Sequence, residues 1–469
     1  MTRKAATNLA LAYFDDEESG FWADLARRVA IPTECQRPEC RPELYRYLEN
    51  EMQPGFEAMG YICSVYDNPI DGMGPVLLAH RHESDDLPTI LGYGHGDVVR
   101  GQEGQWAEDR DPWTLERDGE KVYGRGTADN KAQHSVHMAA LKSVIDERGS
   151  LGFNSKFMIE TGEENGSKGL KELVTQNENN FAADVFFASD GPRVDITKPN
   201  LTLGCRGMHN FDLMLEMREG GHHSGNWGGL LANPGIVLSH ALATIVDTHG
   251  KILVEGWRLP PISNSVREAL KDVKREGGEG APEINAEWGE PGLTAPEKVY
   301  AWNSFEVLAF KTGNPTRPVN AVPPTARANC QLRYVVGTDP DNIRPALRKH
   351  LNENGFEAIE IINPPPSNDA VFAAARTDPD HPWAHWMKEA VTRAYGSTPA
   401  VLPNSGGSIC NDVFQDVLGI PFVWMPLSYT GCSQHAPNEH IIWPLTREGL
   451  ELITGVYWDL GDPATAYRP

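Results

Sequence analysis

The sequence predicts an α/β protein in which a doubly wound sheet domain carries an inserted two-layer α+β domain. In the outer parts of the chain, short apolar segments rich in β-branched and aromatic residues alternate with helical patterns, which is typical of a mainly parallel sheet. In the middle of the chain the apolar and polar residues alternate instead, which is typical of antiparallel strands. The clearest segments of the first kind are TILGY (89–93), KFMIE (156–160), DVFFA (184–188) and PFVWM (421–425).

Two further elements belong to the sheet domain. YICSVYDN (61–68) is expected to be a strand, because it is rich in β-branched and aromatic residues. A helix is expected after Asp129, because Val136, Ala140 and Val144 recur on one stripe at helical spacing. Strands that alternate with helices in this way form a doubly wound sheet.

The pattern changes near Pro199. The expected elements are then, in order, a strand, a helix, a strand, a helix and a strand at NFDLMLEM (210–217), PGIVLSHALATIVD (234–247), CQLRYVV (330–336), PDNIRPALRKHLNENG (340–355) and AIEIIN (358–363). REGGEGAPEINAEWGEPG (275–292) is rich in Gly, Pro and Glu and is expected to be a surface loop. NPPPSND (363–369) then returns the chain to the sheet domain, where a helix is expected at 383–395.

These changes of pattern set the expected domain boundaries. Residues 1–199 and 366–469 form the two parts of the sheet domain, and residues 200–365 form the inserted domain. A chain of 469 residues is long enough for two or three domains with substantial cores.

The composition excludes several classes of partner. The formal net charge of −23 disfavours nucleic acid and anionic membranes, because both repel an acidic surface. No run approaches the roughly 20 apolar residues of a membrane helix, and the N-terminal apolar stretch is too short for a signal peptide. The 7 cysteines are scattered without CxxC pairs, which favours reduced thiols. We therefore expect a cytoplasmic protein that binds neither nucleic acid nor membrane.

Polar side chains follow the apolar segments of the sheet domain. The residues in question are His95 after TILGY, Glu163 and Glu164 after KFMIE, Asp190 after DVFFA, and His435 after PFVWM. Each is expected at the C-terminal end of a strand, the edge of an open α/β sheet at which loops converge and ligands bind. Two imidazoles and several carboxylates brought together there are the inventory of a two-metal hydrolase.

Asp129 in GRGTADNK completes this inventory. Zn²⁺ accepts imidazole nitrogen and carboxylate oxygen, and two neighbouring ions need a shared ligand, for which an aspartate with two oxygens is suited. Asp97, two residues after His95, can accept the second N–H of that imidazole and fix its tautomer. Of the adjacent Glu163 and Glu164, one can bind metal while the other takes a proton from water.

Other candidate motifs are interpreted as structural. His134 and His137 lie about one helical turn apart and His381 and His385 have i,i+4 spacing, but neither pair frames an HExxH motif. GGSIC around Ser408 lacks the final glycine of a GxSxG elbow, and GRGTAD fails the dinucleotide pattern GxGxxG. The sequence therefore favours neither a serine nucleophile nor a nucleotide site.

Taken in order, seven motifs resemble those of a known family. They are GHGDVV, GRGTADNK, ETGEENGS, SDG, RGMHNFD, HHSGNWGG and QHAPNEH, and they run from about Leu91 to His435. This set resembles the M20 metallopeptidases, the group of carnosine dipeptidase, carboxypeptidase G2 and aminoacylase-1. The resemblance implies a zinc-peptidase sheet domain with an inserted lid or dimerisation domain.

The resemblance also implies a role for each metal ligand. His95 and Asp190 bind one ion, and Glu164 and His435 bind the other. Asp129 bridges the two ions. Zn²⁺ is the expected metal, although His and carboxylate ligands also suit Mn²⁺ or Co²⁺.

By the same resemblance, three residues serve the chemistry. Glu163 is the general base and then the general acid, and Asp97 supports the imidazole of His95. His223 in the HSG motif stabilises the oxyanion, often across the interface of a homodimer formed by the inserted domain. The expected reaction is hydrolysis of an amide bond by metal-activated water.

Three further positions match residues that hold the carboxylate end of the substrate in the dipeptidase branch, namely Asn320, Arg333 and Ser408. One departure concerns the pair before GGS, because those dipeptidases often carry Arg-Glu where this chain has Asn404-Ser405. The expected substrate is therefore a dipeptide or an N-acyl amino acid. The alternatives are an amidohydrolase of a non-peptide amide or carbamoyl compound, and a metal-binding protein without catalysis.

Overall fold

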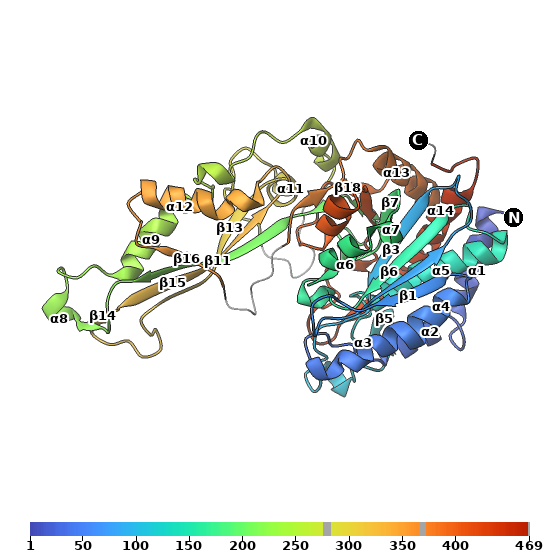
Figure 1. Ribbon diagram of the computed structural model, residues 1–469, viewed down its shortest axis with the longest axis horizontal. Helices are drawn as coiled ribbons and strands as arrows, with labels where there is room; N and C mark the ends of the chain where they lie inside the picture. The colour runs from blue at the N-terminus through green and yellow to red at the C-terminus, as the bar shows by residue number, and fades with distance from the viewer. Residues whose placement is uncertain (275–282, 365–371, 468–469) are drawn as a thin grey trace. The chain divides into compact units, whose positions relative to one another are not determined.

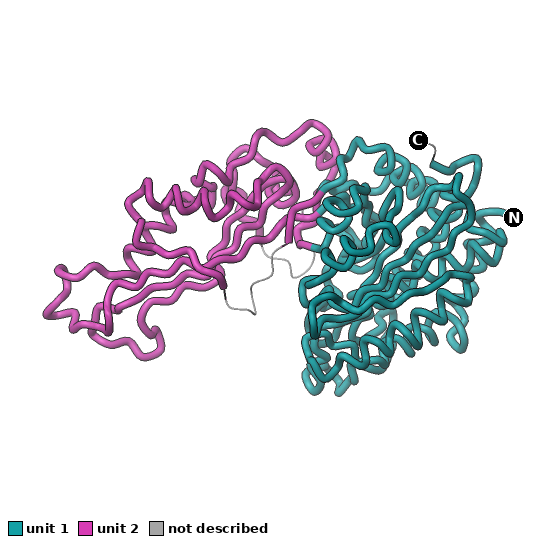
Figure 2. The backbone as a smooth tube through the Cα atoms, in the orientation of Figure 1, with its two compact units in different colours: residues 1–204, 376–403, 409–469 teal, residues 205–375, 404–408 magenta. Residues whose placement is uncertain are grey.

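The computed structural model describes most of the chain, namely residues 1–274, 283–364 and 372–467. Two compact units are formed (Figure 2): unit 1 consists of Met1–Gly204, Arg376–Pro403 and Ile409–Pro469, and unit 2 of Cys205–Ala375 and Asn404–Ser408. Of the two loops expected from the sequence, residues 275–282 and 365–369 lie outside the described residues. No helix in the described ranges combines the length and the apolar composition that a membrane span requires.

Unit 1 is built on an eight-stranded sheet (Figure 1). Its strands, in spatial order, are β1 (Ile62–Tyr66), β2 (Val76–Arg81), β6 (Asn154–Glu160), β3 (Thr89–His95), β7 (Val185–Ala188), β19 (Phe422–Trp424), β9 (Asn200–Thr202) and β18 (Ala400–Leu402). The four strands β6, β3, β7 and β19 are parallel neighbours, and they coincide with the four clearest apolar segments of the sequence. The predicted α/β fold is confirmed.

Helices α1 (Arg3–Asp15), α2 (Phe21–Val29), α5 (Lys131–Arg148), α13 (Pro382–Tyr395) and α14 (Trp443–Gly461) pack as one group in unit 1. The predicted helix after Asp129 is α5, which is buried along most of its surface because it packs against β3 and three other helices. A Cβ atom at Gly94 of β3 would lie 2.4 Å from the Cβ atom of His134 in α5. Glycine therefore permits the close approach of this helix to the sheet.

Smaller elements complete unit 1. They are α3 (Arg41–Tyr47), α4 (Gln53–Glu57), α6 (Leu170–Gln176), α7 (Glu178–Phe181), the paired strands β8 (Pro192–Arg193) and β20 (Ser428–Tyr429), and a small sheet of β21 (His440–Ile442), β5 (Lys121–Tyr123) and β4 (Glu116–Asp118). In that small sheet β21 pairs with β5, which places the segment before β21 beside the segment after β5.

Unit 2 has two layers, a four-stranded sheet and helices packed on one of its faces. The strands, in spatial order, are β13 (Ser304–Thr312), β15 (Thr325–Tyr334), β11 (Gly207–Glu216) and β16 (Glu360–Ile362), and the main helices are α9 (Pro234–Ile245) and α12 (Ile343–Glu353). All the strand pairs are antiparallel. Every second residue of β15 is buried, so one face of the sheet supplies the core of unit 2. The predicted strands and helices of this region are confirmed.

The edge strand β13 was not expected from the sequence. Its residues from Glu306 to Lys311 are exposed, so the strand lacks the alternation of buried residues that β15 shows. The smaller elements of unit 2 are α8 (Ser224–Trp227), α10 (Asn264–Leu270), α11 (Ala295–Tyr300) and the pair β12 (His222–His223) and β14 (Ala321–Val322).

Candidate metal centre

The three central strands of unit 1 bring candidate ligands to one edge of the sheet. His95 is the last residue of β3, and Asp190 follows the end of β7 by two residues. Glu163 and Glu164 lie in a short 3₁₀ turn (Glu163–Asn165) just after β6. Because β6, β3 and β7 are parallel, their carboxyl ends meet, as the sequence predicts.

Two further residues reach this edge from other elements. Asp129 lies two residues before α5, in the segment that follows β5 of the small sheet. His435 lies between β20 and β21, well beyond the end of β19 at Trp424, so the expectation that it directly ends a sheet strand is wrong. Its loop turns sharply, since Ser433, His435 and Asn438 all have positive φ angles.

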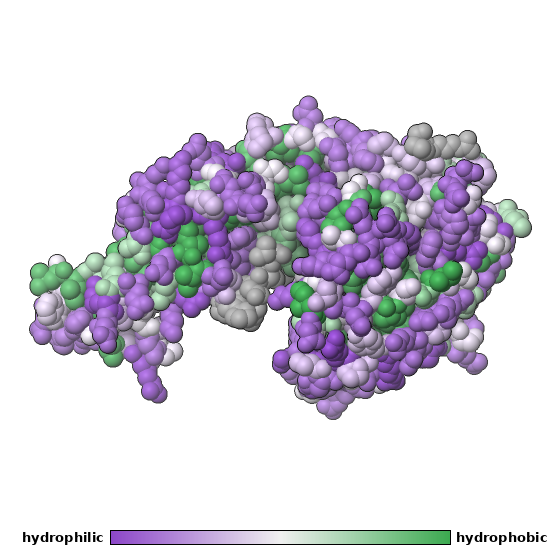
Figure 3. Space-filling model, viewed as in Figure 1, coloured by the Kyte–Doolittle hydropathy of each residue, from purple (hydrophilic) through white to green (hydrophobic). Residues whose placement is uncertain are grey.

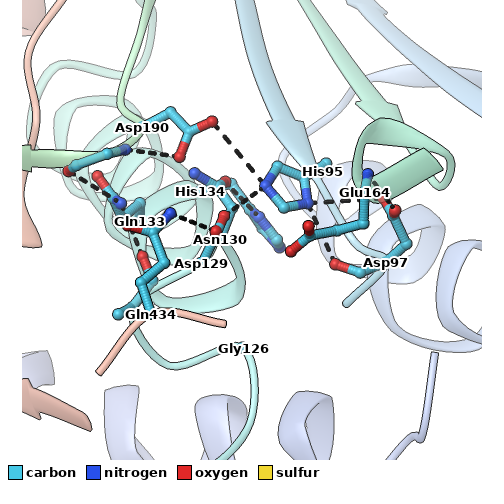
Figure 4. Close-up of polar contacts among 12 residues, drawn as sticks. His95, Asp97, Gly126, Asp129, Asn130, Gln133, His134, Glu164, Asp190 and Gln434 are labelled. Carbon is cyan, nitrogen blue, oxygen red and sulfur yellow. Dashed lines mark hydrogen bonds and ion pairs between the residues drawn. The ribbon is translucent and has the colours of Figure 1, made fainter. Parts of the chain in front are cut away.

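Asp129 lies between the imidazoles of His95 and His435, and Figure 4 shows it beside His95. Its Oδ1 atom is 2.8 Å from Nε2 of His95, and its Oδ2 atom is 3.0 Å from Nε2 of His435. Two groups of possible ligands share this carboxylate, namely His95, Asp129 and Asp190, and Asp129, Glu164 and His435. In each group the ligand atoms lie within 4.8 Å of one another.

The remaining contacts fix the orientation of these side chains. Nδ1 of His95 lies 3.1 Å from the backbone oxygen and 3.5 Å from Oδ1 of Asp97, so the Nε2 atom faces the centre. The Oδ2 atom of Asp97 accepts the backbone N–H of Glu164 at 3.0 Å. Oε2 of Glu164 is 3.1 Å from Nε2 of His435, whereas Oδ2 of Asp190 is 3.9 Å from Nε2 of His95. Asp97 thus contacts both His95 and Glu164, which belong to different ligand groups.

The carboxylates of the centre crowd one another. Burial and the negative charge of Asp129 raise the pKa of Glu164 to about 7 and that of Asp190 to about 6. Burial also raises the pKa of Glu163 well above its ordinary value, and the neighbouring carboxylates act in the same direction, against the opposing effect of His95. Asp129 differs: burial raises its pKa, but the hydrogen bonds to the two imidazoles and their positive charges together outweigh burial and lower the pKa.

This combination fits divalent cations. Four carboxylates and two imidazoles converge from separate elements, and cations between them would relieve the repulsion that raises three of the pKa values. Nitrogen and carboxylate oxygen are also the donor atoms that Zn²⁺, Mn²⁺ and Co²⁺ accept. The donor set therefore suits a metal centre.

The predicted residues of unit 2 form two separate pairs. His223 is exposed and its imidazole caps α8 by accepting the N–H of Gly225, while the backbone oxygen of Asn320 accepts the N–H of Ser224. Nη1 of Arg333 donates to Oγ of Ser408 at 2.9 Å. The first pair lies beyond the start of β15 and the second at its end, and ten strand residues span roughly 30 Å.

Comparison with known proteins decides the family. A model of the protein family described as "Peptidase family M20/M25/M40" matches residues 91–458. The chain belongs to this peptidase family. This chain is 29% identical over 346 residues to a cysteinylglycine-S-conjugate dipeptidase of Corynebacterium striatum. The aligned region covers 71% of this chain and 72% of that protein. This chain is also 25% identical over 488 residues to a β-Ala-His dipeptidase of Rattus norvegicus, and that alignment covers 96% of this chain and 94% of the rat protein.

Solved structures agree with this assignment. An M20 family metallo-carboxypeptidase from Sulfolobus solfataricus matches with a TM-score of 0.77 at 24% identity, over 93% of this chain and 98% of that chain. Human carnosine dipeptidase 1 matches with a TM-score of 0.73 at 23% identity, over 97% and 99%. The resemblance found in the motifs is confirmed, and this M20 family member is a metal-dependent hydrolase.

Several residues at the centre of the M20 protein were not singled out from the sequence. The Nε2 atom of Gln434 donates to Oδ2 of Asp129, and Glu439 accepts the backbone N–H of Asp129 at 3.0 Å. Both residues lie within the QHAPNEH motif, but a glutamine and a glutamate in a loop carry no pattern that separates them from solvated side chains. His134 and His137, interpreted as structural from the sequence, are both buried and hydrogen-bonded to tyrosine hydroxyls, so they are packing residues and not solvent-exposed ones.

Proposed function

We propose that this protein is a dinuclear metallohydrolase that cleaves the amide bond of a dipeptide. The observation that carries the proposal is the position of Asp129, whose two oxygens face two separate ligand groups. In this proposal His95 and Asp190 would hold one ion, Glu164 and His435 would hold the other, and Asp129 would serve both. Zn²⁺ is the proposed metal, because it accepts both nitrogen and carboxylate oxygen in open catalytic sites.

Glu163 is the proposed general base. It belongs to neither ligand group, in contrast to Glu164, yet it lies in the same turn and is half-buried. Ions bound at the centre supply a Lewis acid for the scissile carbonyl and lower the pKa of water. Glu163 accepts the proton of the attacking water and delivers it to the departing nitrogen, so that a neutral amine leaves. Asp97 keeps His95 in one tautomer during these steps.

The residues of unit 2 are proposed to serve the substrate. Arg333 and Ser408, already in contact, are proposed to bind its terminal carboxylate together with Asn320. His223 is the proposed donor to the oxyanion of the tetrahedral intermediate. Because the β-strand between the two pairs is roughly 30 Å long, His223 and Arg333 of one chain are too far apart to contact the same dipeptide. The pairs are therefore proposed to come from two chains.

A homodimer through unit 2 is supported by an exposed apolar edge. Strand β13 is the edge of its sheet, and its residues Val307, Leu308 and Phe310 are each 41% exposed or more. Ile236 of α9 is 60% exposed and lines, with Phe310, a groove of about 540 Å³. Proteins normally cover an exposed apolar edge strand with another element. Pairing of β13 with the β13 of a second copy of the chain, about a two-fold axis, would cover both edges.

The class of substrate rests on the relatives and on one departure from their pattern. The relatives named above are dipeptidases for cysteinylglycine conjugates and β-Ala-His. Asn404 is buried here and its amide donates to the backbone oxygen of Tyr300, a contact within unit 2. An N-acyl amino acid or another small amide is therefore the second candidate. The proposed location is the cytoplasm, because the scattered cysteines suit a reducing compartment.

One experiment tests both the metal content and the substrate. The protein is loaded with Zn²⁺, Mn²⁺ or Co²⁺, assayed for two metal equivalents, and incubated with dipeptides, N-acyl amino acids and carbamoyl compounds, with amine release as the readout. Cleavage of dipeptides by protein that holds two equivalents supports the proposal. Turnover of N-acyl substrates alone would assign the second candidate, and turnover without metal would refute the dinuclear mechanism.

A further inference from the structure

A single buried carboxylate holds the whole loop that ends at the proposed bridging ligand. Glu439 is 1% exposed. Its Oε1 atom accepts the backbone N–H groups of Ala128 at 2.9 Å and Asp129 at 3.0 Å. Its Oε2 atom accepts the N–H of Gly126 at 3.0 Å and Nη1 of Arg125 at 2.8 Å. Four donors of one five-residue segment thus point at one side chain.

The backbone around Glu439 leaves this loop little freedom. Glu439 precedes β21, which pairs with β5, and its own backbone oxygen accepts the N–H of Gly124 at 3.1 Å. Gly126 has a φ angle of 84°, and a Cβ atom there would lie 2.9 Å from Val98 and 3.0 Å from Lys131. The loop is therefore confined on one side by packing and fixed on the other by the carboxylate.

The same residue also anchors the segment of the second histidine. His435 lies four residues before Glu439, in the loop with three positive φ angles. Apart from its contacts at the centre, that loop makes two hydrogen bonds to the segment 102–107. Asn438 accepts the backbone N–H of Ala107, and the backbone oxygen of His435 accepts from the side chain of Gln102. Glu439 thus joins the loop of Asp129 to the loop of His435, and each loop contributes a ligand that faces the other.

We propose that Glu439 is a positioning residue for the metal centre, which sets the carboxylate of Asp129 between the two ligand groups and fixes the separation of Asp129 from His435. The inference rests on the proposed dinuclear centre. A carboxylate is needed because all four partners are donors, whereas a glutamine amide would direct its own N–H₂ group at two of them. Loss of such a supporting contact to a ligand typically lowers metal affinity by about 10- to 100-fold.

The test compares metal affinity in variants of the full chain. In Glu439→Gln the guanidinium of Arg125 loses its buried partner, so the double variant Glu439→Gln/Arg125→Met is made in parallel. The matched control is Glu83→Gln, because Glu83 also accepts two backbone N–H groups, from Leu151 and Gly152, and an arginine. These control contacts lie before the start of β6, at the opposite edge of the sheet.

Zn²⁺ binding to each metal-stripped protein is measured by competition with a chelating dye, and folding is followed by circular dichroism. Binding of two Zn²⁺ equivalents by the wild-type protein would establish the centre on which the inference rests. Binding of fewer equivalents would refute the proposed dinuclear centre and would say nothing about Glu439. We expect the dissociation constants of both ions to rise about 10- to 100-fold in the folded Glu439 variants and to stay unchanged in Glu83→Gln.

A purely structural role would give a different result. In that case the Glu439 variants would unfold at a lower temperature but, while folded, would bind both ions with wild-type affinity, and this outcome overturns the proposal. Equal losses of affinity in Glu83→Gln would also overturn it, because the effect would then be general. Failure of both Glu439 variants to fold with saturating Zn²⁺ would show that Glu439 serves the fold itself, which again overturns the proposal.

Discussion

Glu160 is a buried acid beneath the turn that carries the two central glutamates, and its replacement by glutamine has a calculable effect. It is the last residue of β6 and is 2% exposed. Its Oε1 atom accepts hydrogen bonds from the hydroxyls of Tyr93 at 2.7 Å and Ser167 at 3.0 Å. Burial raises its pKa from 4.5 to about 7. A glutamine can keep both hydrogen bonds through its own oxygen, so the substitution removes mainly the charge.

The sign of the effect follows from the raised pKa. The folded protein binds a proton at Glu160 more tightly than the unfolded chain does, so this group favours folding fully below pH 4.5 and loses that contribution as the pH rises to about 7. Each pKa unit is worth about 1.4 kcal/mol, so the charged carboxylate costs about 3 kcal/mol at pH 8. The advantage of Glu160→Gln over the wild type should therefore grow by about 2–3 kcal/mol between pH 5 and pH 8.

The assay is urea unfolding of the metal-free wild-type and Glu160→Gln proteins at several pH values. The quantity compared is the difference in free energy of unfolding, because the other titrating groups cancel in it. Glu172→Gln, a substitution of an exposed glutamate on α6, removes the same formal charge from the surface and serves as the control. A difference for Glu160→Gln that does not change with pH, or that decreases as the pH rises, would refute the reasoning.

The remaining predictions concern the centre and the edge of unit 2. Glu163→Gln should keep both ions yet lower turnover by about 10²–10⁴-fold, as expected for a general base. Glu164→Gln should instead reduce the metal content, measured by elemental analysis. Similar and modest effects of the two substitutions would mean that the two roles are misassigned. Chelation of the metal should lower the melting temperature, because the ions bind only the folded state, and re-addition should restore it. Phe310→Lys should shift the protein from dimer to monomer in light scattering, and Ile196→Lys, at a position of equal exposure in unit 1, should not.

Much of the fold could be predicted because its strongest signals are local. Parallel strands buried on both faces have continuous apolar sequences, and all four clearest segments became neighbours in the sheet. Strand β13 could not be predicted in this way. Its apolar residues Val307, Leu308 and Phe310 are exposed, so they do not alternate with buried residues as a half-buried strand does.

The candidate site was predictable as far as strand ends determine it. His95 and Asp190 come directly from parallel strands, so their convergence follows from topology. The approach of His435 depends on a loop with positive φ angles, for which the sequence holds no periodic signal. The contacts of Glu439 depend on the pairing of β21 with β5, two short strands about 300 residues apart in the chain. Supporting residues of this kind become visible only when tertiary structure brings them to the ligands.

His223 provides the sharpest test of assembly. It lies at the tip of unit 2, where Figure 3 shows hydrophobic side chains over α8, and Trp227, Leu230 and Val319 near it are 44%, 75% and 78% exposed. An exposed histidine among exposed apolar side chains is placed to contact another surface. Since β15 separates His223 from Arg333 by roughly 30 Å within one chain, a site that uses both residues requires two chains.

This arrangement predicts that two inactive variants complement each other. In a mixed dimer of Glu163→Gln and His223→Ala chains, one site combines an intact Glu163 with the intact His223 of the other chain, and the second site carries both defects. Random exchange makes half of the dimers mixed, so the activity should recover to about one quarter of the wild-type value. A mixture of Glu163→Gln and Asp129→Ala chains, whose lesions both lie in unit 1, should recover nothing in either arrangement. If verified exchange of the first pair also restores no activity, His223 acts within its own chain, and Arg333, which lies roughly 30 Å away along β15, does not contact the same substrate.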